Sequence, residues 1–359
     1  MTSAIKSKAR LKDLAREAGV SIATVSRYLR GMSGVGEKTQ GLIVRAADKL
    51  EVPLPQRSKA AVVAFLLSNR PRLHPFHSRV LEGAEQYCSA LGFNMLYVPF
   101  RYEFRAFWQD LRLPPLLERR ESVRGIIVAG SNSRGLLDML AHKQVPFVVL
   151  GNNVLGEWRN DACDVVWFDD LRGARELTAH LQSLGHRDIW YVGNPRMAWY
   201  ARRYEGYLRA MDEAGLTPHL SSIDSDDEKQ LGYLATKTIL SQGKRVTAIF
   251  AGNDLAASGV YEAVRDHELS IPGDISVAGF GDIEATMAYP SLTSVRVFAD
   301  QVGRQLAGLL MDRITQPELP PQRRVTPTQL VKRDSCASIV ATAGVMAATP
   351  EIRKQTQIG

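Results

Sequence analysis

Short apolar runs alternate with amphipathic segments of helical period along most of this 359-residue chain, and this alternation limits the possible folds more than any other feature. The runs are too short for helices and contain many β-branched residues, as expected of strands buried on both faces of a parallel sheet. Strands are predicted at residues 62–67, 94–98, 125–129, 147–150, 189–192, 248–251 and 276–280, and helices at 80–91, 173–184, 203–214 and 255–265.

Repeated βα units of this kind predict an α/β fold built on doubly wound parallel sheets. Seven predicted strands spread over more than 200 residues suit two such sheets side by side better than one. In this arrangement a ligand binds at the carboxyl ends of the strands, in the cleft between the sheets. We therefore expect a hinged, two-lobed sensor for a small molecule.

The first 51 residues follow a different pattern, which is typical of three short helices. Apolar residues recur at helical intervals from Leu11 to Ala18, and Gly19 can end that helix. Ser21 is a suitable N-cap for a second helix, in which Val25 faces inward. A third helix is predicted from residue 36 to Leu50. Two helices joined through a glycine resemble a helix-turn-helix that presents its second helix to the major groove of DNA, although an ordinary helical hairpin has the same pattern.

The charge distribution gives a second indication of DNA binding. Residues 1–59 contain 12 Lys and Arg against 5 Asp and Glu, whereas residues 60–359 contain 33 of each sign. The whole excess of positive charge therefore lies in the segment with the predicted helix-turn-helix. A solvated basic surface is the simpler explanation, but binding to the phosphates of DNA requires such a concentration of charge.

The identities of the residues in this segment carry a specific resemblance. Lys12-Asp-Leu-Ala15, Ala18-Gly-Val-Ser21 and Thr24-Val-Ser-Arg27 resemble the DNA-binding domain of the LacI/GalR transcriptional regulators. The resemblance continues, in the family's order, at residues 184–189, 203–207, 253–257, 271–280, 290–295 and 330–335. It implies a helix-turn-helix domain followed by a periplasmic-binding-protein-like sensor, in a homodimeric regulator, most often a repressor, that binds a double-stranded operator under the control of a sugar or sugar derivative.

Composition shifts divide the chain into four parts. A segment with two prolines and several polar residues separates the third helix from the first strand and is expected to be a linker. The last residues contain no family landmark and are expected to be disordered. The predicted parts are residues 1–51, the DNA-binding domain; 52–59, the linker; 60–335, the ligand-binding and dimerisation domain; and 336–359, the tail.

By the resemblance, the reading helix runs from Ile22 to Arg30. Arg27 is suited to a bidentate bond with guanine or to a phosphate, although a surface arginine can also pair with a carboxylate of its own helix. The small apolar side chains at the start of the helix suit thymine methyl groups, and the hydroxyl groups suit phosphates or, in the first position, a helix cap. The implied DNA contacts are Ser21, Ile22, Ala23, Thr24, Ser26, Arg27 and Arg30.

Matching the sensor residue by residue implies ligand contacts at Ser68, Phe76, Arg203 and Asn253. Arg203 is suited to sugar hydroxyls, a carboxylate or a phosphate, with a surface ion pair as its alternative role. Phe76 can stack on a ligand or simply fill the lobe. Asn253 offers both a donor and an acceptor, whereas the neighbouring Asp254 is expected to be only a helix cap.

The sequence departs from the family in the linker. Family members usually follow the third helix with a Pro-Asn step and a hinge helix that inserts a leucine into the minor groove. Here Pro53-Leu-Pro55 leads almost directly into the first strand, which leaves too few residues for that helix. Ligand binding is therefore expected to reach the DNA by another route.

The sequence also departs from the family in the ligand site. Gly281 replaces an aspartate that many sugar-binding relatives carry, and Asp227 stands where an aromatic residue is often found. Both changes weaken the case for an ordinary hexose. Without a carboxylate at position 281 a negatively charged ligand is less repelled, so we expect a sugar acid or a phosphorylated sugar held by Arg203.

Other classes of protein are disfavoured. No nucleophile, base and orienting group converge, so no enzyme is expected, and His74 and His77 lack a third ligand for a metal. Three widely spaced cysteines indicate neither a disulfide framework nor a cofactor site. Without a membrane-length apolar stretch or an export signal, a cytoplasmic protein is expected. The alternative function is a solute-binding protein of the periplasmic type without a transcriptional role.

Overall fold

The computed structural model describes residues 11–29, 35–50, 52, 61–70, 74–118, 123–156, 158, 162–283 and 285–339. The chain divides into two compact units, one made of the residues up to Val62 with Gly92–Asn94, and the other of Val63–Leu91 and everything from Met95 onward. Among the described helices, none is both long and apolar enough to cross a membrane.

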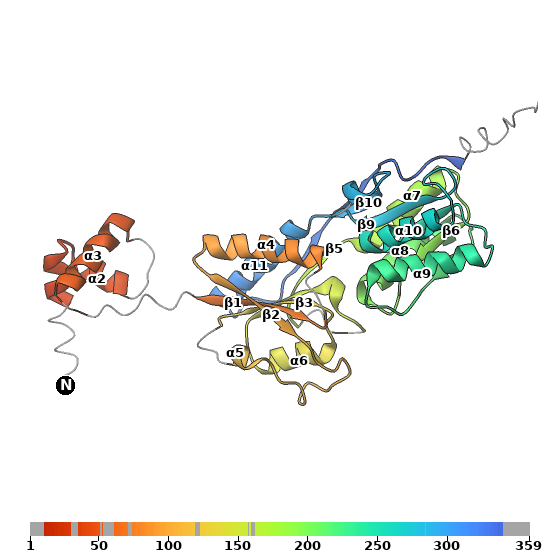
Figure 1. The fold of residues 1–359 in the computed structure, drawn as a ribbon. Helices are drawn as coiled ribbons and strands as arrows, with labels where there is room; N and C mark the ends of the chain where they lie inside the picture. Colours follow the sequence, from red (N-terminus) through yellow and green to blue (C-terminus); the bar gives the residue numbers. More distant parts are fainter. Residues whose placement is uncertain are drawn as a thin grey trace, which may run out of the picture. The chain divides into compact units, whose positions relative to one another are not determined.

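The N-terminal unit contains the three predicted helices. Residues 11–17 are helical, and they are followed by α2 (Ile22–Leu29) and α3 (Glu37–Lys49) (Figure 1). Gly19 adopts φ +66° at the end of the first helix, a conformation that glycine takes without strain. The buried core is formed by the residues at helical spacing in the sequence, namely Leu14, Ala15, Ala18, Val25, Ile43, Ala46 and Ala47. The predicted three-helix domain is confirmed.

The first lobe of the sensor is built on a six-stranded sheet in the order β11-β5-β4-β3-β1-β2. Its strands are β1 (Val62–Ser68), β2 (Asn94–Phe100), β3 (Ile126–Gly130), β4 (Phe147–Leu150), β5 (Asp164–Phe168) and β11 (Arg323–Thr326). Its helices are α4 (Pro75–Ala90), α5 (Pro115–Glu118), α6 (Arg134–His142), η1 (Gly151–Asn153) and α11 (Ala299–Thr315). Figure 1 shows α4 and α11 side by side over one face of this sheet and α6 on the other.

The second lobe repeats this plan with the strand order β12-β10-β9-β8-β6-β7. Its strands are β6 (Ile189–Val192), β7 (His219–Ser221), β8 (Ala248–Ala251), β9 (Ser276–Gly281), β10 (Thr293–Val297) and β12 (Thr328–Val331), and only the pairing of β10 with β12 is antiparallel among the pairs described for this sheet. Its helices are α7 (Asp170–Ser183), α8 (Ala198–Glu213), α9 (Glu228–Ser241), α10 (Asp254–Asp266) and η2 (Ala285–Met287). Because crossovers are right-handed, the pairs α7/α8 and α9/α10 cover opposite faces.

The chain passes between the lobes three times, each time through a single residue between two elements. Asp169 joins β5 to α7, Phe298 joins β10 to α11, and Pro327 joins β11 to β12. The first and third connections are hydrogen-bonded to each other, since the Asp169 amide donates to the Thr326 carbonyl at 3.0 Å and the Thr328 hydroxyl donates to the Asp169 carbonyl at 3.0 Å. These connections place the carboxyl ends of both sheets at one cleft.

All seven predicted strands are present, and the predicted α/β architecture with two doubly wound sheets is confirmed. The predicted helices at 80–91 and 203–214 begin earlier, at Pro75 and Ala198. The first of them can begin at Pro75 because proline is favoured in the first turn of a helix and because the His74 side chain caps this helix, accepting from the Phe76 amide at 3.1 Å.

The second lobe extends beyond Ser335, where the sequence placed the start of the tail. The Cys336 thiol donates to the Val277 carbonyl at 3.3 Å, the Ala337 amide donates to the Ser276 hydroxyl at 3.0 Å, and the Ile339 amide donates to the Leu184 carbonyl at 3.0 Å. The ordered packing therefore reaches Ile339. Residues 340–359 and the predicted linker from residue 53 to 59 lie outside the described residues.

Candidate functional site

The second helix of the N-terminal unit, α2, turns one side inward and leaves the other open. Val25 is fully buried, whereas Ile22 is 45% exposed and Ala23 and Arg27 are also exposed. Thr24 and Ser26 are half-buried. The exposed side contains the small apolar groups, hydroxyls and guanidinium that direct readout of base edges and phosphates uses.

Two of the predicted DNA-contacting residues have identifiable local roles. The Ser21 hydroxyl accepts a hydrogen bond from the Thr24 amide at 3.0 Å, which makes it the N-cap of α2, and it lies 2.8 Å from the Thr24 hydroxyl. Arg27 makes no ion pair with any described carboxylate, although nearby Arg16 pairs with Asp13 at 3.3 Å. Arg27 is thus available to DNA, while Arg30 lies outside the described residues.

A cavity lies between the two lobes of the sensor. It is lined by Arg70, His74, Pro75, Phe76, His77, Asn153 and Phe168 from the first lobe, by Trp199, Arg203, Asn253, Asp254, Leu255, Phe280, Gly281 and Ile283 from the second, and by Val297 at a connection between them. Three of the four predicted ligand contacts, Phe76, Arg203 and Asn253, therefore meet at one cavity.

Ser68, the fourth predicted contact, does not line this cavity. It is fully buried at the end of β1, where its hydroxyl donates to the Ala129 carbonyl at 2.9 Å and contacts the Asn132 side chain. The hydrogen bonds of the Ser68 hydroxyl are therefore made within the first lobe. The structure gives Ser68 the role of joining β1 to the segment after β3, and its ligand contact remains a prediction.

Arg203 is a buried cation without an ion-pair partner among the described residues. Its side chain is only 7% exposed, and one guanidinium nitrogen donates to the Gly252 carbonyl at 2.6 Å. The guanidinium carbon lies 4.2 Å from the centre of the Phe280 ring, and Nε has no hydrogen-bond partner. The neighbouring Arg202 pairs with Asp170 at 2.7 Å instead. A surface ion pair is therefore not the role of Arg203.

The remaining predicted contacts are held by their neighbours. Phe76 packs edge-on against Phe168, with ring centres 5.5 Å apart. Asn253 caps α10, since its Oδ1 accepts from the Ala256 amide at 2.7 Å. Asp254 is therefore not the cap that the sequence suggested; its two oxygens accept from the Ser294 hydroxyl at 2.7 Å and from the Ile283 amide at 2.9 Å. Burial raises the pKa of this carboxyl.

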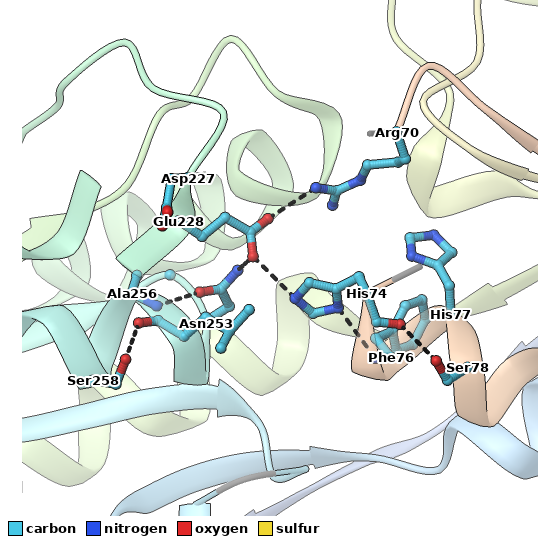
Figure 2. Close-up of polar contacts among 12 residues, drawn as sticks. Arg70, His74, Phe76, His77, Ser78, Asp227, Glu228, Asn253, Ala256 and Ser258 are labelled. Carbon is cyan, nitrogen blue, oxygen red and sulfur yellow. Dashed lines mark hydrogen bonds and ion pairs between the residues drawn. The ribbon is translucent and has the colours of Figure 1, made fainter. Parts of the chain in front are cut away.

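The sequence reasoning missed a polar cluster that joins the lobes at the cavity (Figure 2). The Glu228 carboxylate, at the start of α9, lies 3.1 Å from Arg70 Nη1 and 3.0 Å from His74 Nε2, both in the first lobe, and accepts from Asn253 Nδ2 at 2.7 Å. Burial alone would raise the pKa of Glu228, but the hydrogen bond from His74 and the charge of Arg70 lower it to about 2. The Arg70 guanidinium also lies 3.8 Å from the centre of the Trp199 ring.

Weak signals for this cluster were present in the sequence. Arg70 lies three residues after a predicted strand, and Glu228 adjoins Asp227, the residue singled out as a departure from the family. The structure shows that Asp227 caps α9, with Oδ1 accepting from the Gln230 amide at 3.0 Å, whereas Glu228 points to the cleft. Within the described part of the chain, no three side chains of the His, Cys, Asp and Glu types form a candidate metal site.

Comparisons with known proteins agree with these two sites. Residues 10–51 match the profile of the bacterial regulatory proteins of the lacI family, and residues 178–336 match that of a periplasmic binding protein-like domain. The chain is 30% identical to the HTH-type transcriptional repressor PurR of Erwinia tasmaniensis, over 92% of this chain and 97% of that protein. It is 29% identical to the ribose operon repressor of Escherichia coli K12, over 91% of this chain and 99% of that protein.

Solved structures give the same picture. The complex of the transcriptional regulator CelR with cellobiose is 29% identical, with a TM-score of 0.68 and coverage of 90% of this chain and 99% of that one. A regulator from Enterococcus faecium with bound ribose is 27% identical, with a TM-score of 0.65 and coverage of 77% and 99%. The Lac repressor dimer bound to operator, at 21% identity and a TM-score of 0.69 over 90% of this chain and 98% of that one, shares the fold.

Proposed function

This chain belongs to the LacI family of bacterial regulatory proteins, and we propose that it is a DNA-binding repressor whose operator affinity is set by a negatively charged metabolite in the cleft. The single observation that carries the effector half of this proposal is Arg203, a buried guanidinium at the cavity with no carboxylate partner among the described residues. A carboxylate or phosphate on the ligand would compensate its charge.

The DNA half of the proposal rests on α2. Its exposed side combines Ile22 and Ala23 for base edges with Arg27 for guanine or phosphate, and the Ser21 cap fixes where the helix begins. The hydroxyls of Ser21, Thr24 and Ser26 and the side chain of Arg30 remain proposed contacts. A solute-binding protein without a transcriptional role is not supported, because the N-terminal match is to regulatory proteins.

The proposed effector is compatible with the ligands named for the relatives but differs from them in charge. One relative is described with cellobiose and one with ribose, which are neutral sugars. The sugar acid or phosphorylated sugar expected from the sequence would add the negative charge that Arg203 favours, so these sugar derivatives remain proposed effectors. Ligand binding would change the angle between the lobes and through it the affinity for the operator.

We further propose that the chain acts as a homodimer in the cytoplasm. A two-fold dimer would place two α2 helices on successive major grooves of a palindromic operator, about 34–36 Å apart. The relatives are transcriptional repressors, and no catalytic activity is part of this proposal.

Selection of bound sequences from random DNA duplexes with the full-length chain tests the regulatory function. We expect a palindromic consensus with half-sites about one helical turn apart, bound roughly 10³-fold or more tightly than unrelated DNA at physiological salt. Binding that depends only on salt concentration, with no enriched sequence, would contradict the proposed function.

A further inference from the structure

The unpartnered polar atoms around the cavity are all nitrogens. Among the described lining residues, four side chains keep a buried polar atom without a hydrogen-bond partner, and a fifth such atom, His74 Nε2, is ion-paired with Glu228. The four are Arg70 Nε, His77 Nδ1, Trp199 Nε1 and Arg203 Nε. Arginine and tryptophan nitrogens of this kind carry hydrogen and can only donate.

The histidine in this set is also a donor. His77 Nε2 lies 2.9 Å from the Asn153 amide nitrogen, which can only donate, so Nε2 must accept and Nδ1 must carry the ring hydrogen. Burial holds the pKa of His77 well below its ordinary value, with the charge of Arg70 acting in the same direction, so the ring is neutral. The buried side-chain nitrogens of the lining residues that have no partner are therefore all donors.

Three of the acidic and amide side chains at the cavity already accept hydrogen bonds from the protein. Both Glu228 oxygens are bound by Arg70, His74 and Asn253. Both Asp254 oxygens accept hydrogen bonds, and Asn253 Oδ1 accepts from the amide of Ala256. Gly281, which also lines the cavity, supplies no side chain.

The walls of the cavity are apolar and largely aromatic. Phe76 and Phe168 contribute from the first lobe and Trp199 and Phe280 from the second, and the aliphatic side chains are Leu255, Ile283 and Val297. Aromatic residues from both lobes suit a ligand with a ring and apolar faces.

We propose that the effector is a ring compound that carries a carboxylate and few or no hydroxyl groups, such as an aromatic or alicyclic carboxylate. The carboxylate accepts from Arg203 and the neighbouring donors, and the ring packs between the aromatic walls. A sugar acid shares the negative charge, but its hydroxyls bring further donors to a cavity whose carboxylates already accept hydrogen bonds from the protein. This inference rests on the proposed function, because it names the ligand class of the same cleft.

Isothermal titration calorimetry of the full-length chain tests this inference with five probes. Benzoate and cyclohexanecarboxylate are ring carboxylates, benzyl alcohol is the uncharged ring, glucuronate is the sugar acid and ribose is the neutral sugar. We expect the better ring carboxylate to bind with a Kd at least about tenfold below those of benzyl alcohol, glucuronate and ribose. Tighter binding of glucuronate or ribose, equal binding of benzyl alcohol, or no detectable binding of either ring carboxylate would overturn it.

Variants on α8 locate the carboxylate. Arg203→Gln should weaken binding of the ring carboxylate at least about tenfold and leave benzyl alcohol unchanged. Arg209→Gln, on the same helix but on its exposed side, should behave like the unmodified chain in both titrations. Equal losses of affinity for both ligands would contradict the assigned contact between Arg203 and the carboxylate. If Arg203→Gln does not fold, Arg203→Lys replaces it in these titrations, and the comparison of probes on the unmodified chain still tests the inference.

Failure of this inference is separable from failure of the proposed function. DNA selection uses no small ligand, so a palindromic consensus together with preferred binding of glucuronate would retain the repressor and reject the ring carboxylate.

Discussion

Arg27 and Arg203 are the cations at the two proposed binding sites, and neither forms an ion pair with a described carboxylate. Most other arginines of the sensor are paired, such as Arg202 with Asp170 and Arg313 with Asp164. An unpaired guanidinium is costly where it is buried, as at Arg203, and costs little where it is exposed, as at Arg27. At both places, we propose that a negatively charged ligand is the partner.

Arg27→Ala is expected to lower affinity for the selected operator by about 1–3 kcal/mol, because a bidentate contact to guanine is lost. Fluorescence anisotropy with labelled operator measures this change. The matched control is Arg209→Ala in the sensor, which removes the same charge from an exposed helix position. Equal operator affinity of the Arg27 variant and the unmodified chain would remove Arg27 from the reading role.

Substitutions of Ser21 separate its cap from its proposed phosphate contact. Ser21→Ala should lower the stability of the N-terminal unit by about 1 kcal/mol, because the hydrogen bond to the Thr24 amide is lost. Ser21→Asp should keep the cap and the stability but weaken operator binding, because a carboxylate repels phosphates. Urea unfolding followed by circular dichroism gives the first quantity and anisotropy the second. An aspartate variant that binds operator normally would leave Ser21 with the cap alone.

Residue roles could be predicted where the sequence fixes local geometry, and not where distant segments meet. The cap at Ser21 and the inward position of Val25 follow from helical spacing alone. Arg70 and Glu228 are separated by 158 residues, so nothing local in the sequence indicates their contact. The position of the Ser68 side chain could not be predicted, because the end of a strand can turn its side chain either to the cleft or, as here, to the neighbouring segment.

At the scale of elements, the Glu228 cluster ties the start of α9 to the segment that leads into α4 (Figure 2). Glu228→Gln is expected to destabilise the sensor by about 3–5 kcal/mol, because it leaves Arg70 buried without its charge partner. Urea unfolding measures this loss. Glu205→Gln breaks an exposed pair with Arg209 and should cost less than about 1 kcal/mol. Similar small losses for both variants would show that the cluster does not hold the lobes.

The stability difference between the unmodified chain and Glu228→Gln should depend on pH, and this dependence follows from the pKa of Glu228. Its pKa is about 2 in the folded chain against an ordinary value of 4.5, so the unfolded chain binds the proton more readily. The stabilisation is fully present above pH 4.5 and is lost as the pH falls toward 2. The stability difference between the unmodified chain and Glu228→Gln should therefore shrink over this range, and a difference that stays constant would contradict the assignment.

Helices α4 and α11 approach each other closely at two glycines. A Cβ atom on Gly303 would lie 2.0 Å from the Val80 carbonyl oxygen, and one on Gly83 would lie 2.1 Å from the Asp300 carbonyl oxygen. Gly303→Ala is expected to destabilise the sensor by about 3 kcal/mol or more in thermal unfolding, because the helices must separate. Gly41→Ala in α3, where nothing lies within 4 Å, should instead stabilise its unit by about 0.5–1 kcal/mol. A stable Gly303 variant would contradict this packing.

Central strands were predictable from the sequence and most edge strands were not. β3, β4 and β8 are buried throughout and form continuous apolar runs. β7, β11 and β12 lie at sheet edges, are three or four residues long and are only partly buried, so they carry no such run. Their positions follow from the tertiary structure, since each pairs with a strand from another part of the chain.

At the scale of the whole molecule, the chain combines a DNA-binding unit with a two-lobed sensor, as a member of a repressor family. A ligand that favours one arrangement of the lobes can change the affinity of the chain for its operator. Operator binding must then change the affinity of the chain for the ligand by the same factor. The sequence predicts that the residues between the two units are too few for a separate hinge helix. The coupling between the sites is therefore the property that most needs measurement.

Fluorescence anisotropy of the selected operator, titrated with the full-length chain, measures that coupling directly. The titration is made without ligand and at saturation with the probe that binds most tightly in calorimetry, and it is repeated with Arg203→Gln. The account predicts that the ligand changes operator affinity by about five- to 150-fold in the unmodified chain and has no effect on the variant. An operator affinity that is unchanged by a ligand shown to saturate the cleft would contradict it.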